Sequence, residues 1–244
     1  EAVEGSSLRR LLYRSVLPGV NNRRLIEGSM RNAGHWLRLY HSMPPGPSTM
    51  SRHTTRAEYI EFVAAATEFL SKHRGERQWF RSVRERLEDV SQDLPEYLPL
   101  GTGHGDFALR NVLVTPEGRI AVIDTRARYQ VPIYEDIGYF LVSLRHNWAQ
   151  IASRGALFQR RFLDVMEQEF LAGYFGHDAV PRTAVRLFEV QAMLDIWGEV
   201  ITRRVRGGTL QGRITSRIRR ALISAYNRKV IADLLGLSVE PAPS

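Results

Sequence analysis

Three side chains that carry oxygen, Asp106, Asn111 and Asp124, lie near one another in the middle of the chain. Two short apolar runs, 112–114 and 119–123, stand between Asn111 and Asp124. Both runs are rich in β-branched residues, and a Pro-then-Gly turn separates them, so they predict a β-hairpin. Because a hairpin folds back on itself, we expect Asn111 and Asp124 to lie close together, with Asp106 on the loop just before.

This set of residues suits phosphoryl transfer. Asp106 can orient a substrate hydroxyl and accept its proton, whereas Asn111 and Asp124 offer the hard oxygen ligands that Mg²⁺ prefers. Phosphoryl transfer depends mainly on positioning and charge neutralisation, so a loop Asp, a loop Asn and a second Asp after a hairpin are sufficient on this side of the site. An isolated Asp-Asn pair on a loop would more simply be turn chemistry.

The stretch HGDFALRNVLV, followed by VIDT, resembles the His-x-Asp-x4-Asn and metal-Asp motifs of protein-kinase-like phosphotransferases. The Gly after the His is most similar to the aminoglycoside phosphotransferase and choline kinase branch. The resemblance implies ATP, or another nucleoside triphosphate, and Mg²⁺ as cofactors. It implies that Asp106 is the catalytic base, that His104 is the scaffold imidazole of the loop, and that Asn111 and Asp124 are the metal ligands and contact the nucleotide.

Two further residues follow from the same resemblance. The Ala-Leu-Arg before the Asn is similar to the catalytic loop of tyrosine kinases, which implies that Arg110 positions the acceptor or the γ-phosphate. Asp136 resembles the family's buried Asp that ties the catalytic loop to the next helix. It also precedes an apolar helical pattern, so a plain N-cap is the alternative.

Residues 1–7 resemble the hinge between the two lobes of such kinases, which implies that the backbone of Glu1 and Val3 contacts the adenine edge. Without the resemblance, this segment is a frayed terminus ahead of a helix capped by Ser6 or Ser7. The sequence contains neither a phosphate-covering strand loop nor a strand Lys. We therefore expect residues 1–244 to form the C-terminal lobe of a kinase without its N-terminal lobe.

The expected fold is α+β and mostly helical, with the small β-hairpin carrying the catalytic and metal-binding loops. Apolar residues at helical spacing predict helices at 21–42, 56–73 and 76–94 and a last helix at 213–235. Residues 101–140 form the catalytic core, 141–235 a helical acceptor-side subdomain, and 236–244 a tail. Three apolar stripes are expected in the core: Ile137, Phe140, Leu141, Leu144 and Trp148; Leu163, Met166, Phe170 and Tyr174; Leu187, Val190, Leu194, Trp197, Ile201 and Val205.

Composition narrows the class of protein. The chain has 244 residues, 43% of them hydrophobic, and no cysteine, which excludes disulfides and thiolate metal sites. No apolar run is long enough to predict a transmembrane helix, and no apolar segment near the first residue predicts a signal peptide, so the cytoplasm is the default. The formal net charge is +8, and Lys occurs only at Lys72 and Lys229.

The predicted function is transfer of a γ-phosphoryl group to a hydroxyl of a small molecule: a sugar, a nucleoside, a lipid head group or an aminoglycoside-like acceptor. In the acceptor-side region Glu189, Asp195 and Glu199 are interleaved with arginines, a mixture that favours a neutral or anionic acceptor. The Arg-rich final helices indicate either an anionic partner or a solvated basic face. A degenerate pseudokinase or interaction module and a basic nucleic-acid-binding protein are the alternatives, and the oligomeric state stays open.

Overall fold

The protein is seen here in a computed structural model that describes residues 4–45, 53–125, 129–202 and 210–238, with residues 210–217 described by their backbone alone. The chain divides into two compact units. The first consists of Glu1–Thr54 and Pro99–Arg182, and the second of Thr55–Leu98 and Thr183–Ser244. Each unit is therefore built from two segments that are far apart in the sequence.

The first unit combines helices with short strands. Its helices are α1 (Leu8–Arg14), α2 (Arg23–His41), α5 (Ile133–Arg145), α6 (Trp148–Ala152) and α7 (Arg160–Phe175). Its strands are β1 (Ser6–Ser7), β2 (Leu100–Gly103), β3 (Val112–Val114), β4 (Ile120–Val122) and β5 (Tyr129–Pro132). The expected α+β, mostly helical fold is confirmed.

The predicted hairpin forms the centre of a three-stranded antiparallel sheet in the order β1-β3-β4. Val112 pairs with Val122, which confirms the two short strands. β1, which pairs Ser6 with Val114, was not predicted. Two-residue strands carry too little pattern to be recognised, and here Ser7 also caps α1 by accepting a hydrogen bond from the backbone N–H of Arg10 (3.3 Å).

A second sheet pairs β2 with β5 in antiparallel register. The sequence indicated only an extended approach at this point, because β2 reads Leu-Gly-Thr-Gly and lacks β-branched residues apart from Thr102. Gly103 pairs with Tyr129, so the two ends of the segment that carries the catalytic motif are held together. This pairing gives the loop a fixed base.

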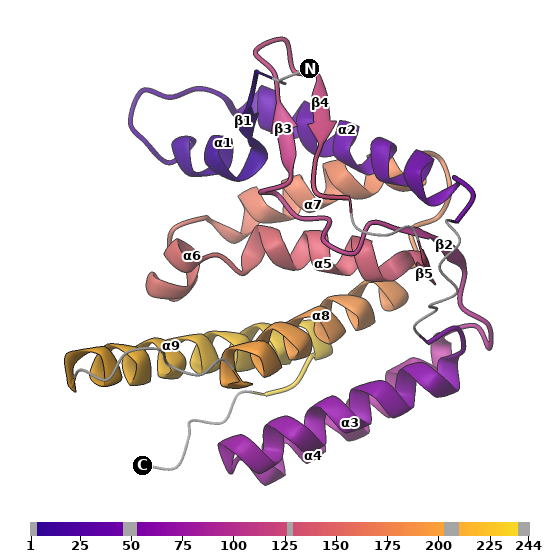
Figure 1. Cartoon of the computed structure of the whole chain (residues 1–244), viewed down its shortest axis with the longest axis vertical. Coiled ribbons are helices and arrows are strands. Elements are labelled where there is room, and N and C mark those ends of the chain that lie inside the picture. Colours follow the sequence, from indigo (N-terminus) through magenta and orange to yellow (C-terminus); the bar gives the residue numbers. More distant parts are fainter. Residues whose placement is uncertain (1–3, 46–52, 126–128, 203–209, 239–244) are drawn as a thin grey trace. The chain divides into compact units, whose positions relative to one another are not determined.

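Helices α2 and α7 lie side by side in the first unit (Figure 1). Two glycines make the close approach possible. A Cβ on Gly34 would lie 2.1 Å from the carbonyl oxygen of Phe170, and a Cβ on Gly173 would lie 1.9 Å from that of Arg31. Backbone therefore packs directly on backbone at this crossing, and the apolar face of α2 (Ile26, Met30, Leu37) is fully buried.

The second unit is helical in its described part. It contains α3 (Arg56–Arg74), α4 (Arg77–Val90), a 3₁₀ turn (Ser91–Asp93), α8 (Arg182–Thr202) and α9 (Leu210–Leu235). Its core is aromatic: the Trp197 ring lies 5.4 Å from that of Phe80, and the Tyr59 hydroxyl donates to the carbonyl of Leu187 (2.8 Å). Within the described ranges, no helix is both long enough and apolar enough to span a membrane.

Trp148 corrects one of the expected core stripes. Its side chain is 50% exposed, whereas Ile137, Phe140, Leu141 and Leu144 are buried as expected. The reason is that α5 ends at Arg145, and Asn147 caps a new helix by accepting from the N–H of Gln150 (2.9 Å). The register therefore breaks before Trp148. Val205, at the end of the third stripe, lies outside the described residues.

Candidate active site

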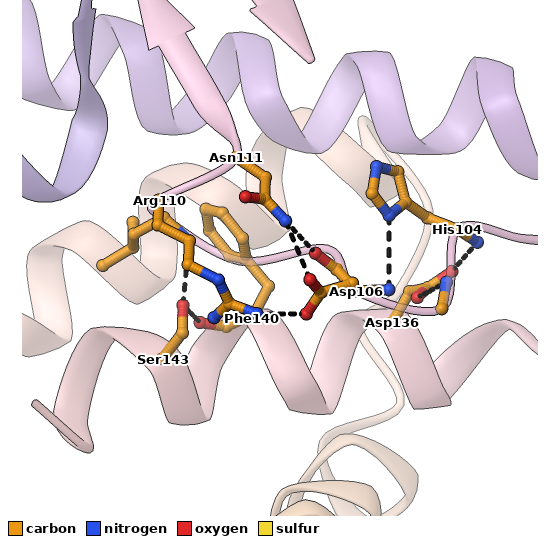
Figure 2. Close-up of polar contacts among 9 residues, drawn as sticks. His104, Asp106, Arg110, Asn111, Asp136, Phe140 and Ser143 are labelled. Atoms are coloured by element: carbon orange, nitrogen blue, oxygen red, sulfur yellow. Dashed lines mark hydrogen bonds and ion pairs between the residues drawn. The ribbon is translucent and has the colours of Figure 1, made fainter. Parts of the chain in front are cut away.

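Asp106 lies on the loop between β2 and β3, and both of its carboxylate oxygens are engaged (Figure 2). Oδ2 accepts a hydrogen bond from the side-chain amide of Asn111 (3.1 Å), and Oδ1 pairs with the Arg110 guanidinium. The side chain is 13% exposed, so one edge of the carboxylate still reaches solvent. The structure thus brings together Asp106, Arg110 and Asn111, as the sequence predicted.

Asn111 is oriented by its own amide. Its Nδ2 donates to the main-chain carbonyl of Asp106 (2.8 Å) as well as to the carboxylate. Because both N–H bonds point toward Asp106, the amide oxygen points away from it. The residue is 3% exposed, so this orientation is held by packing as well as by hydrogen bonds. An amide fixed in this way presents an oxygen, not a nitrogen, on its outer side.

Asp124 follows β4 and is brought to the same end of the hairpin as Asn111. The backbone N–H of Ile123 donates to the carbonyl of Asn111 (3.0 Å), which closes the hairpin directly beside both residues. Asp124 is exposed and has a φ of 60°, a left-handed backbone that a non-glycine residue seldom adopts. The expected proximity of the two residues is therefore carried by backbone pairing.

Asp136 anchors the loop from the first turn of α5. Its Oδ2 accepts from the backbone N–H of His104 (2.6 Å), and its Oδ1 accepts from that of Gly105 (3.0 Å). The N-cap position of α5 is Pro132, so the alternative role of Asp136 as a plain N-cap is wrong. Burial by itself would raise the pKa of the Asp136 carboxyl, but hydrogen bonds from His41 and His104 outweigh it and lower the pKa.

His41 and Tyr174 complete this anchor, and the sequence did not assign them to the site. His41 Nε2 lies 3.2 Å from Asp136 Oδ2, and His41 Nδ1 lies 2.7 Å from the Tyr174 hydroxyl. Because a carboxylate only accepts, Nε2 carries the proton and Nδ1 accepts from Tyr174. The Leu-x-x-His ending of the second predicted helix was the one available signal for His41. Tyr174 had none beyond its place in an apolar stripe.

His104 is a structural member of the loop, in agreement with the expected scaffold role. It is fully buried, and its Nδ1 accepts from the backbone N–H of Asp106 (3.3 Å). Its ring lies edge-on to Phe107 at 5.4 Å between centroids. Burial lowers the pKa of His104, although the charges of Asp136 and Asp106 partly oppose this shift. A neutral imidazole with Nδ1 as acceptor is therefore the form that fits the loop.

The Gly after His104 has a geometric reason. Gly105 has a φ of +77°, and a Cβ at this position would lie 2.6 Å from the Tyr129 hydroxyl. Both the left-handed backbone and the contact with β5 exclude a larger residue. The His-Gly-Asp spelling of the motif is thus required by the sheet formed between β2 and β5.

Arg110 stands at the exposed side of Asp106 and is 41% exposed. Desolvation lowers its pKa, but hydrogen bonds with Tyr139 and Asp106 outweigh this effect and raise the pKa, so the guanidinium stays charged. The loop is also fixed to α5 through Ser143, whose hydroxyl accepts from the backbone N–H of Leu109 (3.1 Å; Figure 2). Tyr139 and Ser143 were not predicted, because both lie on the polar face of a helix that looks ordinary in the sequence.

The oxygen ligands expected for a metal fit Mg²⁺ better than a transition metal. Within the described residues there is no group of three or more His, Cys, Asp or Glu arranged to hold a metal ion. Mg²⁺ requires fewer protein ligands, since waters and substrate phosphates complete its coordination. The outward amide oxygen of Asn111 and the exposed carboxylate of Asp124 suit that requirement. Glu1 and Val3, the predicted adenine contacts, lie outside the described residues.

Comparison with solved structures shows the fold. A choline/ethanolamine kinase family protein from Mesorhizobium loti matches with a TM-score of 0.56 and 17% identity, over 96% of this chain and 73% of that chain. A glucosamine kinase, solved with glucosamine, ADP and inorganic phosphate, gives 0.58 and 15%, over 96% and 59%. An ethanolamine kinase from Plasmodium vivax gives 0.52 and 13%, over 94% and 65%. The chain thus spans about three fifths to three quarters of these kinases and has their α+β fold.

The sequence itself matches one family model. Residues 1–179, which include the whole catalytic loop, match the model of the phosphotransferase enzyme family. A search of curated proteins found no match. The matched region covers well over half of the chain, and the loop that it contains holds Asp106, Asn111 and Asp136 in one hydrogen-bonded arrangement. The chain therefore belongs to the phosphotransferase enzyme family.

Proposed function

We propose that this protein transfers the γ-phosphoryl group of a nucleoside triphosphate, ATP by preference, to a hydroxyl of a small molecule, with Mg²⁺. The observation that carries the proposal is the contact between Asp106 and Asn111 on a loop that the hairpin joins to Asp124. Family membership supports the reaction class. The ADP found with the related glucosamine kinase supports the use of a nucleotide.

Asp106 is the proposed general base. As the acceptor hydroxyl approaches the γ-phosphorus, its proton passes to Asp106, a new oxygen–phosphorus bond forms, and the bond to the bridging oxygen breaks. The nucleoside diphosphate leaves with the electron pair of that bond. The hydrogen bond from Asn111 keeps one carboxylate oxygen in place, so the base is oriented before the acceptor arrives.

Asn111 and Asp124 are the residues that would hold Mg²⁺, and the ion would neutralise the charge of the phosphates. The contribution of the protein lies in the fixed amide of Asn111 and in the backbone bond that keeps Asp124 beside it. Glu1 and Val3 are the proposed backbone contacts of the adenine edge. His104 holds the backbone of the loop that carries Asp106.

Arg110 bears on the acceptor. Its charged, half-exposed guanidinium touches the proposed base, so an acceptor hydroxyl must approach Asp106 past a positive charge. A polycationic acceptor would meet repulsion there, whereas a neutral or anionic one would not. We therefore favour a sugar, nucleoside or lipid head group over an aminoglycoside. Once the acceptor binds, Arg110 is free to leave Asp106 for the acceptor or the γ-phosphate.

Calorimetric titration of the natural protein with Mg²⁺-ATP tests the proposal. Asp124→Ala should weaken binding by at least about tenfold and only when Mg²⁺ is present, because it removes a charged ligand. Asp106→Asn should bind the nucleotide nearly normally but lose transfer to any acceptor by about 10² to 10⁴-fold. Asp93→Ala, at an exposed position of the second unit, is the matched control.

Two results would contradict the proposal. Turnover of a true acceptor by Asp106→Asn at the normal rate would remove Asp106 as the base. Absence of any Mg²⁺-dependent nucleotide binding would favour a degenerate relative that serves as an interaction module.

A further inference from the structure

A cavity of about 380 Å³ opens between α3 and α4 in the second unit. Its inner wall is the buried ring of Phe80, and hydroxyl groups of Thr67 and Ser71 lie on the α3 side. The volume falls within the range of small-molecule sites, which is about 300 to 1,000 Å³. None of the residues proposed for catalysis belongs to this unit.

The charge of the lining is strongly positive. Lys72, Arg77, Arg81 and Arg84 all line the cavity, and Glu68 is the one acidic residue among its lining residues. The three arginines stand at spacings of four and three residues along α4, which places them on one face of the helix. The sequence showed mixed charge in this segment but did not show that the cations converge.

Only part of this charge is neutralised by the protein. Lys72 Nζ lies 2.7 Å from Glu68 Oε1, and Arg84 Nε lies 3.3 Å from Oε1 of Glu88, which is outside the cavity. Within the described part of the chain, Arg77 and Arg81 have no carboxylate within ion-pair distance. Two guanidinium groups therefore face the cavity without a counter-charge.

The amino end of α4 adds to the positive potential. Arg77 is the first residue of this 14-residue helix, and Glu76 at the N-cap makes no side-chain capping bond. The Glu76 carboxylate is instead turned to Arg74 (3.6 Å) and Arg228 (3.3 Å). The first N–H groups of α4 thus lack the acidic cap that commonly neutralises them, and the helix dipole is directed at the same region.

We propose that this cavity binds the phosphate group of a small phosphorylated molecule. Guanidinium groups bind phosphate through paired hydrogen bonds, and two of them with an ammonium group match the charge of a phosphate dianion. The hydroxyls of Thr67 and Ser71 and the room beyond a single phosphate fit the polar remainder of such a molecule. The site is separate from the proposed catalytic residues and does not depend on the proposed function.

The test follows the arginine side chains directly. In the natural protein, the ¹⁵N–¹H signals of Arg77 and Arg81 Nε should shift in a saturable manner as inorganic phosphate is added at constant ionic strength. Arg77→Gln/Arg81→Gln should weaken phosphate affinity by about tenfold or more. Arg160→Gln/Arg161→Gln removes the same charge from exposed positions on α7 and should change it less than about twofold.

The remaining arms separate the alternatives. Asp124→Ala should leave the phosphate-induced shifts of Arg77 and Arg81 unchanged, so failure of the catalytic proposal would not affect this result. If the signals do not shift, or if both double variants weaken binding equally, the site does not exist. If the signals respond to vesicles of anionic lipid but not to inorganic phosphate, the face binds a membrane surface and the proposal of a small-molecule site is wrong.

Discussion

At the scale of single residues, the proposed base depends on a carboxylate that does not itself reach the substrate. Asp136 accepts the backbone N–H groups of His104 and Gly105 and is in turn held by His41 and Tyr174. These contacts leave the buried carboxylate with no freedom to turn. The position of Asp106, two residues beyond His104, is therefore set by a side chain 30 positions later in the sequence.

Asp136→Asn should be strongly destabilising. The amide can replace only one acceptor oxygen, so its NH₂ group would face a donor, either the His104 N–H or His41 Nε2. Breaking such a buried arrangement costs about 3 to 5 kcal/mol. Urea denaturation measures the loss. Asp178→Asn, which alters an exposed ion pair with Arg38, should cost less than about 1 kcal/mol.

The same variant has a pH signature. Because the pKa of Asp136 is lowered in the folded state, its stabilisation is present above the unfolded value of about 3.9 and is lost as the pH falls through the folded value. Asp136→Asn should therefore show a smaller loss of stability than the natural protein between neutral pH and the acid range. Equal acid sensitivity of the two proteins would contradict the role given to this carboxylate.

His104 makes a second pH-dependent contribution with its own window. Burial lowers its pKa, so the folded state prefers the neutral ring, and stability falls as the pH drops below the unfolded value of about 6.5. In His104→Asn, whose amide oxygen can replace Nδ1 as acceptor, the free energy of unfolding should change less between pH 7.5 and 5.5. Guanidinium denaturation at the two pH values checks this, with the exposed His177→Asn as control for loss of an imidazole.

At the scale of elements, periodicity identified the helices but not their contacts. The apolar spacing between Ile26 and Tyr40 predicted α2 within about two residues at each end. The same spacing did not distinguish Gly28, which faces open space, from Gly34, which touches α7. Whether a helix glycine matters depends on the neighbouring helix, and that information is not local.

Gly173→Ala should destabilise the protein by about 1 to 3 kcal/mol or more, because the new methyl group meets the Arg31 carbonyl and must separate α2 from α7. Gly28→Ala, on the exposed side of α2, should stabilise it by about 0.5 to 1 kcal/mol through helix propensity. Thermal unfolding of the two variants should give shifts of opposite sign. A neutral Gly173→Ala would show that the crossing is looser than described.

At the scale of the whole molecule, the family match and the compact units have different boundaries. The match ends at residue 179, but the second unit joins α3 and α4 to α8 and α9. The rings of Phe80 and Trp79 lie 5.4 and 5.9 Å from that of Trp197 on α8. A chain that ends near the match boundary would therefore leave an apolar face of α3 and α4 uncovered.

We expect a fragment of residues 1–182 to aggregate or to bind a hydrophobic dye strongly, since it exposes Tyr59, Phe80 and Leu87, which are buried in the complete chain. Gel filtration and dye fluorescence, with the 244-residue chain as control, test this. A monomeric fragment with a cooperative unfolding transition would show that α3 and α4 do not need α8 and α9.

The Arg-rich end of the chain illustrates why charge alone was ambiguous. Arg228, counted in the sequence among the cations of a basic helix, pairs with Glu76 at 3.3 Å and lies over the ring of Trp79. The side chains of Arg213 and Arg217 lie outside the described residues. An anionic partner at this helix stays a prediction, whereas the convergence of charge between α3 and α4 became visible only in three dimensions.

The sequence by itself determined the chemistry, because the catalytic motif is local. Asp106, Asn111 and Asp124 lie within one loop and one hairpin, where turn residues and β-branched runs suffice to predict the proximity. Tertiary structure alone decided what holds that motif: the β2–β5 pairing, the His41 and Tyr174 anchor, and the assignment of α3 and α4 to the second unit. His41 and Asp136 are 95 residues apart. Contacts over such separations arise from packing of whole faces, and no local spacing in the chain encodes them.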